Sequence, residues 1–157
     1  MDNHKKFLQE AINLSITNVK EGKGGPFGAI IVKNNEIIAH GTNQVTMTND
    51  PTAHAEIVAL RNACKILQDF QLTDCILYTS CEPCPMCMGA IFWARPKSVY
   101  FGNTREDAAK IGFDDSFIYE QLALDPVKRL IPSYHLKNTH AQEAFDLWRE
   151  TTTKILY

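Results

Sequence analysis

Two short motifs constrain the fold of this chain more than any other part of it. The first is H-A-E at residues 54–56, and the second is C-P-M-C at residues 84–87. Asp50-Pro51 favours a helix start just before the first motif, because Asp caps helix N-termini and Pro fits the first turn. Cys84-Pro85 has a similar form and predicts a second helix. Both motifs therefore belong near helix N-termini, and the fold must bring these two ends together.

The residue types at the two motifs are those of a catalytic zinc site. His54, Cys84 and Cys87 are zinc-type ligands, and three protein ligands leave the fourth position of a tetrahedral zinc ion to water. Bound zinc lowers the pKa of that water to about 7, but a further group must carry its proton. Glu56, two residues from His54, suits this role. We therefore expect a Zn²⁺ site with Glu56 as the proton carrier.

Two simpler interpretations of the same residues stay open. Cys81 could join His54, Cys84 and Cys87 in a closed structural Cys3His zinc site. Alternatively, the three cysteines of residues 81–87 could be ordinary core thiols. Structural zinc mainly stabilises chains too small to form a core, whereas this chain has 157 residues, 45% of them hydrophobic. Both interpretations also leave Glu56 without a role.

The pattern of apolar segments predicts an α/β fold. Strand-helix-strand order implies parallel pairing with right-handed crossovers, while Asn34-Asn35 predicts a tight hairpin turn. The apolar runs between the turns indicate a sheet that is covered on both faces. We expect strands at 27–33, 36–41, 75–80, 97–101 and 131–136, with helices at 3–20, from 50, at 84–94, 104–110 and 139–153.

Composition narrows the possible partners and the location. The net charge is −2, whereas proteins that bind a nucleic-acid backbone usually have an excess of Lys and Arg. No apolar run reaches the roughly 18 residues of a membrane helix, and the N-terminus lacks the apolar stretch of a signal peptide. Five cysteines, three of them close together, favour metal ligands over disulfides. We expect a cytoplasmic protein with a small-molecule substrate.

Five segments carry a resemblance to a known family. They are G-G-P-F-G-A-I-I-V, N-D-P-T-A-H-A-E, Y-T-S-C-E-P-C-P-M-C, F-W-A-R-P and F-D-D-S-F-I-Y. Along nearly its whole length the chain resembles the cytidine deaminase-like zinc deaminases, and the last segment and the terminal Tyr are most similar to the bacterial guanine deaminases. The resemblance implies one zinc-dependent deaminase domain over residues 1–157, with a three-layer α/β/α fold around a mixed five-stranded sheet.

The resemblance also implies a reaction, the hydrolysis of guanine to xanthine and ammonia. A water activated by zinc would attack C2 of the purine. Glu56 would protonate a ring nitrogen and then the departing amine. The backbone N–H of Ala55, which follows His54, and an N–H near Cys84 would hold the oxygen.

Further site residues follow from the same resemblance. Asn43 would hydrogen-bond the purine, and Asp115 would be a second carboxylate near its amino and N–H edge. Phe27 and Trp93 would form apolar walls, and Tyr157 would close the site as part of a C-terminal segment, residues 139–157, exchanged between the subunits of a homodimer. From the residues alone, Asn43 and Asp115 could instead cap loops, and Phe27 and Trp93 could be core.

Other functions remain open at the level of sequence. A tRNA adenosine deaminase, or a deaminase of cytosine or guanosine, would share four of the five segments. A zinc-stabilised interaction module would keep the ligands but would need no Glu56.

Overall fold

The computed structural model describes residues 3–157, which divide into two compact units, one up to Asp115 and one from Ser116 to Tyr157. Within the described residues, no helix is both long and apolar enough to cross a membrane. The elements of the first unit are α1 Asn3–Lys20, β1 Gly28–Lys33, β2 Glu36–Thr42, α2 Val45–Thr48, α3 Ala55–Leu67, β3 Cys75–Cys81, α4 Pro85–Ala94, β4 Ser98–Asn103 and α5 Arg105–Lys110. Those of the second are α6 Ser116–Ala123, η1 Pro126–Lys128 and α7 Gln142–Glu150.

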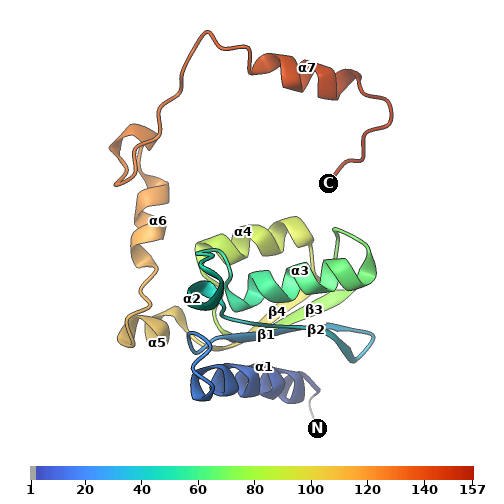
Figure 1. The fold of residues 1–157 in the computed structure, drawn as a ribbon, viewed down its shortest axis with the longest axis vertical. Coiled ribbons are helices and arrows are strands. Elements are labelled where there is room, and N and C mark those ends of the chain that lie inside the picture. Colours follow the sequence, from blue (N-terminus) through green and yellow to red (C-terminus); the bar gives the residue numbers. More distant parts are fainter. Residues whose placement is uncertain (1–2) are drawn as a thin grey trace. The chain divides into compact units, whose positions relative to one another are not determined.

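The first unit is an α/β sandwich around a mixed sheet of four strands in the order β2-β1-β3-β4. Strand β1 runs antiparallel to β2 and β3, whereas β3 and β4 are parallel. Helix α1 covers one face, and α3 and α4 cover the other (Figure 1). The three layers and the mixed sheet agree with the expectation from the sequence, and so does the Asn34-Asn35 turn, where both residues have positive φ.

The predicted fifth strand is wrong. Residues 131–136 form no strand, and the large apolar side chains of Ile131, Tyr134 and Leu136 are 82%, 71% and 74% exposed. A short apolar run becomes a strand only where another strand accepts its backbone hydrogen bonds, and Pro132 also lacks an N–H to donate. An apolar run in the sequence does not show whether another strand lies beside it in the fold, so the pattern alone could not predict the missing strand correctly.

Each face of the sheet has its own hydrophobic cluster. The larger one packs Ala29, Ile31 and Leu77 of the sheet against the small residues of α3. The smaller one packs Ile30, Val32 and Tyr78 against α1. Alternate residues of β1 therefore enter opposite layers, as the pleat of a strand requires.

Helix α3 begins later than the sequence suggested. Its N-cap is His54 rather than Asp50. The Asp50 carboxylate accepts hydrogen bonds from the backbone N–H and the hydroxyl of Thr52, at 2.8 and 2.6 Å, which is an Asx turn and not a helix cap. Because of this turn, α3 starts directly after His54, the first metal-type ligand, and not at Asp50. The segment expected as a loop before it also contains the short helix α2.

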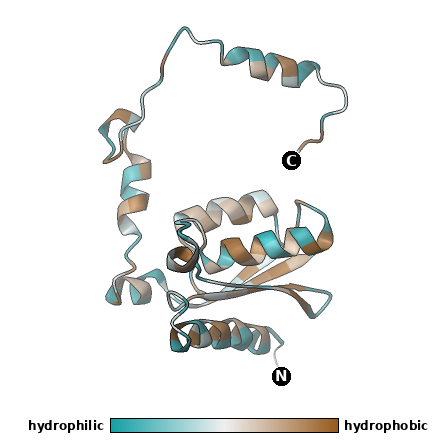
Figure 2. Ribbon diagram, viewed as in Figure 1, coloured by the Kyte–Doolittle hydropathy of each residue, from teal (hydrophilic) through white to brown (hydrophobic). Residues whose placement is uncertain are grey.

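The second unit has no buried large hydrophobic residue among the residues that the structure describes. Phe145, Leu147 and Trp148 on α7 are 71%, 66% and 46% exposed, and this helix carries apolar and polar residues side by side (Figure 2). The helix is shorter than the expected 139–153, and residues 116–123, for which no helix was expected, form α6. An amphipathic helix gains most of its stability from packing its apolar face, so these faces need a partner surface.

Candidate active site

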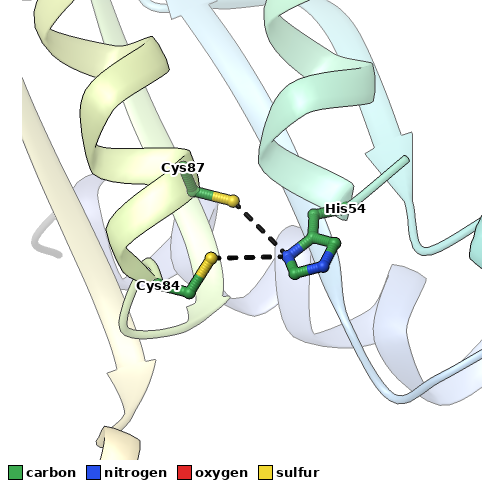
Figure 3. Close-up of side chains that lie close together, drawn as sticks. All are labelled: His54, Cys84 and Cys87. Atoms are coloured by element: carbon green, nitrogen blue, oxygen red, sulfur yellow. Dashed lines mark hydrogen bonds between the residues drawn. The ribbon is translucent and has the colours of Figure 1, made fainter. Parts of the chain in front are cut away.

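Three metal-type ligands meet where two helices begin. His54 is the N-cap of α3 and Cys84 is the N-cap of α4, with Cys87 in the first turn of α4. The Nδ1 atom of His54 lies 3.6 Å from the Sγ of Cys84 and 3.6 Å from the Sγ of Cys87. The three side chains point toward one another (Figure 3), and their ligand atoms all lie within 4.8 Å of one another.

These distances suit a tetrahedral zinc ion. Zn–S bonds of about 2.3 Å and Zn–N bonds of about 2.0 Å place ligand N and S atoms roughly 3.6 Å apart at tetrahedral angles. The donor set of two thiols and one imidazole is also one that zinc prefers. The residues present therefore fit a zinc ion held through His54 Nδ1, Cys84 Sγ and Cys87 Sγ.

The protonation of the ligands is coupled. Hydrogen bonding with Cys87 and then with His54 lowers the pKa of Cys84 to about 4, although burial opposes this. The hydrogen bond with Cys84, together with burial, raises the pKa of Cys87, and the bond with Cys84 also raises the pKa of His54. A divalent cation that binds all three groups must displace their protons, so its affinity falls in acid.

Glu56 lies beside this cluster and is almost fully buried, with 6% of its surface exposed. Its Oε2 is 3.5 Å from the Sγ of Cys87. Burial raises the pKa of the Glu56 carboxyl. A buried carboxyl with a raised pKa can hold and release a proton near neutral pH, which is what a general acid-base requires.

Cys81 is not part of the cluster. In the described part of the chain, the metal-type group near this point consists of His54, Cys84 and Cys87. The thiol of Cys81 instead donates to the carbonyl oxygen of Thr104 at 3.6 Å, and burial raises its pKa to about 11. Because the Cys81 thiol is turned to Thr104 and lies outside the cluster, the structure does not support the closed Cys3His interpretation.

Asn43 sits just past the end of β2 and is buried, with 8% of its surface exposed. Its backbone N–H donates to the carbonyl oxygen of Phe27 at 3.1 Å, and the next residue, Gln44, donates to the carbonyl of Ala53 at 2.9 Å. Ala53 directly precedes His54. The loop that carries Asn43 is thus tied by backbone hydrogen bonds to the segment that carries the first metal-type ligand.

Asn18 is a site-related residue that the sequence analysis missed. It lies on α1, is 2% exposed, and donates its side-chain amide to the carbonyl oxygen of Asn43 at 3.0 Å. A signal was present, because Phe7, Ala11 and Ser15 mark a buried stripe of α1 that Asn18 continues. An amide on such a stripe must find hydrogen-bond partners inside the protein.

Two aromatic rings and a carboxylate lie in the same unit. Phe27 is half-buried, and its ring meets that of Phe113 edge to face with 4.9 Å between centroids. Asp115 is partly buried; burial, and then the negative charge of Cys84, raise the pKa of its carboxyl.

The other expected site residues occupy different environments. Ala55 is fully buried at the first position of α3, where backbone N–H groups have no partner within the helix. Trp93 on α4 is 63% exposed, so it is not a core residue of the first unit. Tyr157 belongs to the second unit and is 70% exposed.

Comparison with a family model gives a match over residues 1–103, to the cytidine and deoxycytidylate deaminase zinc-binding region. This range includes β1 to β4 and both helix N-termini that carry the ligands.

Individual proteins give further likenesses. Guanine deaminase of Bacillus subtilis (strain 168) is 54% identical over 155 residues, which are 99% of this chain and 99% of that protein. An X-ray structure of guanine deaminase from Bacillus subtilis superposes with a TM-score of 0.96 at 54% identity and covers 98% of both chains. The tRNA-specific adenosine deaminase of Buchnera aphidicola subsp. Baizongia pistaciae is 45% identical over 101 residues, 64% of this chain and 62% of that protein.

Proposed function

The chain belongs to the cytidine and deoxycytidylate deaminase zinc-binding family, and we propose that it is a zinc-dependent guanine deaminase, which hydrolyses guanine to xanthine and ammonia. One observation carries the choice of substrate. The likeness to the Bacillus subtilis guanine deaminase extends over 99% of both chains, far beyond the family match that ends at residue 103. It therefore includes the Asp114-Asp115 segment and at least nearly all of the second unit.

The chemistry follows from the residues at the two helix N-termini. Zinc held by His54, Cys84 and Cys87 supplies a Lewis acid that makes a water nucleophilic near neutral pH. Glu56 accepts the water proton, delivers it to a ring nitrogen of guanine, and returns a proton to the departing amine. The buried environment of Glu56 suits this shuttle, because it keeps the carboxyl's pKa high. The backbone N–H of Ala55 donates to the oxygen that develops at C2.

The purine would be held by groups that complement its edges. Guanine carries donors at N1 and N2, which the Asp115 carboxylate can accept, and acceptors that the Asn43 amide can meet. Phe27, backed by Phe113, provides an apolar face for the ring. Trp93 and Tyr157 would close the pocket.

We also propose a cytoplasmic homodimer in which the C-terminal segment, residues 139–157, is exchanged between subunits. The exposed apolar residues of the second unit support a partner surface. The five free cysteines support a reducing compartment.

A tRNA adenosine deaminase is the second candidate, because of the 45% identity to such an enzyme over 101 residues. The net charge of −2 argues against it, since binding to a tRNA backbone relies on cationic side chains.

The test is ammonia release from guanine, adenine, cytosine and guanosine in parallel, with the zinc-loaded protein, alongside a tRNA substrate with adenosine. We expect turnover of guanine alone, with xanthine as product. Turnover of another compound without guanine would refute the proposed substrate and leave the zinc chemistry in place.

A further inference from the structure

Asn18 connects two loops beside the proposed site. Its side-chain Nδ2 donates to the carbonyl oxygen of Gly25 at 2.9 Å and to that of Asn43 at 3.0 Å. The first carbonyl belongs to the loop between α1 and β1, and the second to the end of β2. With 2% of its surface exposed, Asn18 cannot exchange these partners for water, so both loops depend on it.

The same loops fix the orientation of the Asn43 side chain. The backbone N–H of Gly25 and that of Val45 both point at the Oδ1 of Asn43, at 3.3 and 3.4 Å. Only the oxygen of an amide can accept hydrogen bonds, so the two N–H groups determine which end of the Asn43 amide faces the loop. The Nδ2 of Asn43 points elsewhere, and among residues 3–157 it donates to no protein atom. It is therefore available to a substrate.

Gly24 shows how closely the two loops approach. A Cβ at this position would lie 2.3 Å from the carbonyl oxygen of Asn43 and 3.1 Å from the Nδ2 of Asn18. The contact with the backbone carbonyl of Asn43 is too short for a side chain to fit without a shift of the backbone, and the contact with Asn18 is tight. Because the two loops lie this close, the hydrogen bonds of Asn18 determine where the N–H of Gly25 lies. That N–H in turn orients the Asn43 amide.

We propose that Asn18 is a positioning residue for substrate binding: it holds the Gly24-Gly25 loop against Asn43, so that the Nδ2 of Asn43 faces the purine as a hydrogen-bond donor. This inference rests on the proposed function, in which Asn43 contacts the base. Asn18 itself touches no reacting atom. Asn18 therefore affects the affinity for guanine and not the proton transfers by Glu56.

The test is the variant Asn18→Asp in the full-length, zinc-loaded protein. This change keeps the side-chain shape but places a carboxylate oxygen against two carbonyl oxygens in place of the donor. We expect the KM for guanine to rise about tenfold or more, equivalent to the loss of a hydrogen bond at about 1.4 kcal/mol, with kcat changed less than about twofold. Asn13→Asp is the matched control. Asn13 lies on the same helix, is exposed, and accepts a bond from Gln9 that Asp can also accept.

A double-mutant cycle with Asn43→Ala separates positioning from general loosening. If Asn18 acts through Asn43, then Asn18→Asp adds no further rise in KM once the Asn43 amide is gone. Additive effects on KM, or a fall in kcat with KM unchanged, would overturn the proposal. The side chain of Asn18→Ser is uncharged and too short to reach both carbonyl oxygens. If Asn18→Asp does not fold, the KM of Asn18→Ser for guanine provides the same test. Absence of guanine turnover in the unmodified protein would instead refute the proposed function.

Discussion

At the scale of single residues, burial separates the roles of the groups around the cluster. Glu56 is a carboxyl that lies beside the ligands and is excluded from water. Cys84 and Cys87 lie with His54 in the cluster, whereas the nearby Cys81 lies outside it. The arrangement thus places one buried carboxyl next to the cluster and turns a third nearby thiol toward Thr104.

Replacement of Glu56 by Gln should abolish catalysis and leave the metal in place. The amide has nearly the same shape but cannot carry a proton between water and purine, and general acid-base catalysis contributes about 100-fold to 10,000-fold. We expect kcat for guanine to fall at least about 100-fold with one zinc per chain retained, measured by steady-state kinetics and metal analysis. A fall of only a few-fold would show that another group moves the proton.

Cys81→Ser and Cys84→Ser should differ sharply in zinc content. Cys84 lies in the His54-Cys84-Cys87 cluster that we propose holds the zinc, whereas Cys81 bonds to Thr104. We expect Cys81→Ser to retain one zinc per chain and Cys84→Ser to lose most of it on dialysis against a chelator. Equal loss of zinc from both variants would instead support the closed Cys3His interpretation.

At the scale of elements, the site depends on how closely β2 and α3 pack. Gly41 lies on β2, and a Cβ there would be 2.1 Å from the carbonyl oxygen of Ala55 and 2.5 Å from the backbone nitrogen of Ala59. These backbone atoms belong to the first turns of α3, directly after His54. The absence of a side chain at Gly41 therefore sets the position of the helix that presents the first ligand.

Gly41→Ala should destabilise the fold and weaken zinc binding together. Overpacking of this kind lowers the free energy of unfolding by about 1–3 kcal/mol. If α3 shifts to relieve the clash with the new Cβ, the start of α3 moves, and His54 moves with it. Thermal unfolding and a competitive zinc titration measure the two effects. Gly89→Ala on α4 is the control, since a Cβ there meets nothing within 4 Å and Ala favours a helix. Equal stability of the two variants would contradict the steric argument.

At the scale of the whole molecule, the first unit holds the metal-type cluster and the second has exposed apolar side chains. The second unit places Ile155, Leu156 and Tyr157 at 69%, 73% and 70% exposure. Large exposed apolar surfaces mark interaction sites. The proposed exchange of residues 139–157 in a dimer gives these residues a partner and gives each site a lid from the other subunit.

Mixed dimers can test the exchange. One chain carries Glu56→Gln with an intact tail, and the other lacks residues 155–157 but keeps Glu56. Each homodimer should have little activity, the first without a proton carrier and the second without a lid. If tails are exchanged, refolding the two chains together should restore one of the two sites in each mixed dimer, about half of the activity of the unmodified dimer, because the intact tail then closes the site that has Glu56. No recovery in confirmed mixed dimers would show that each tail closes its own site.

The sequence by itself determined the family's zinc chemistry and most of the elements. His54, Glu56, Cys84 and Cys87 could be predicted as site residues because zinc chemistry restricts residue types strongly, and the structure brings the three metal-type ligands together. The Asn34-Asn35 turn could be predicted because positive φ restricts residue types too. The sequence indicated neither the start of α3 nor the missing fifth strand: Asp50 can cap a helix or form an Asx turn, and residues 131–136 need a neighbouring strand. Only the tertiary structure showed Cys81 turned to Thr104 and Asn18 beneath Asn43, because hydrogen bonds between distant segments depend on packing that local patterns do not encode.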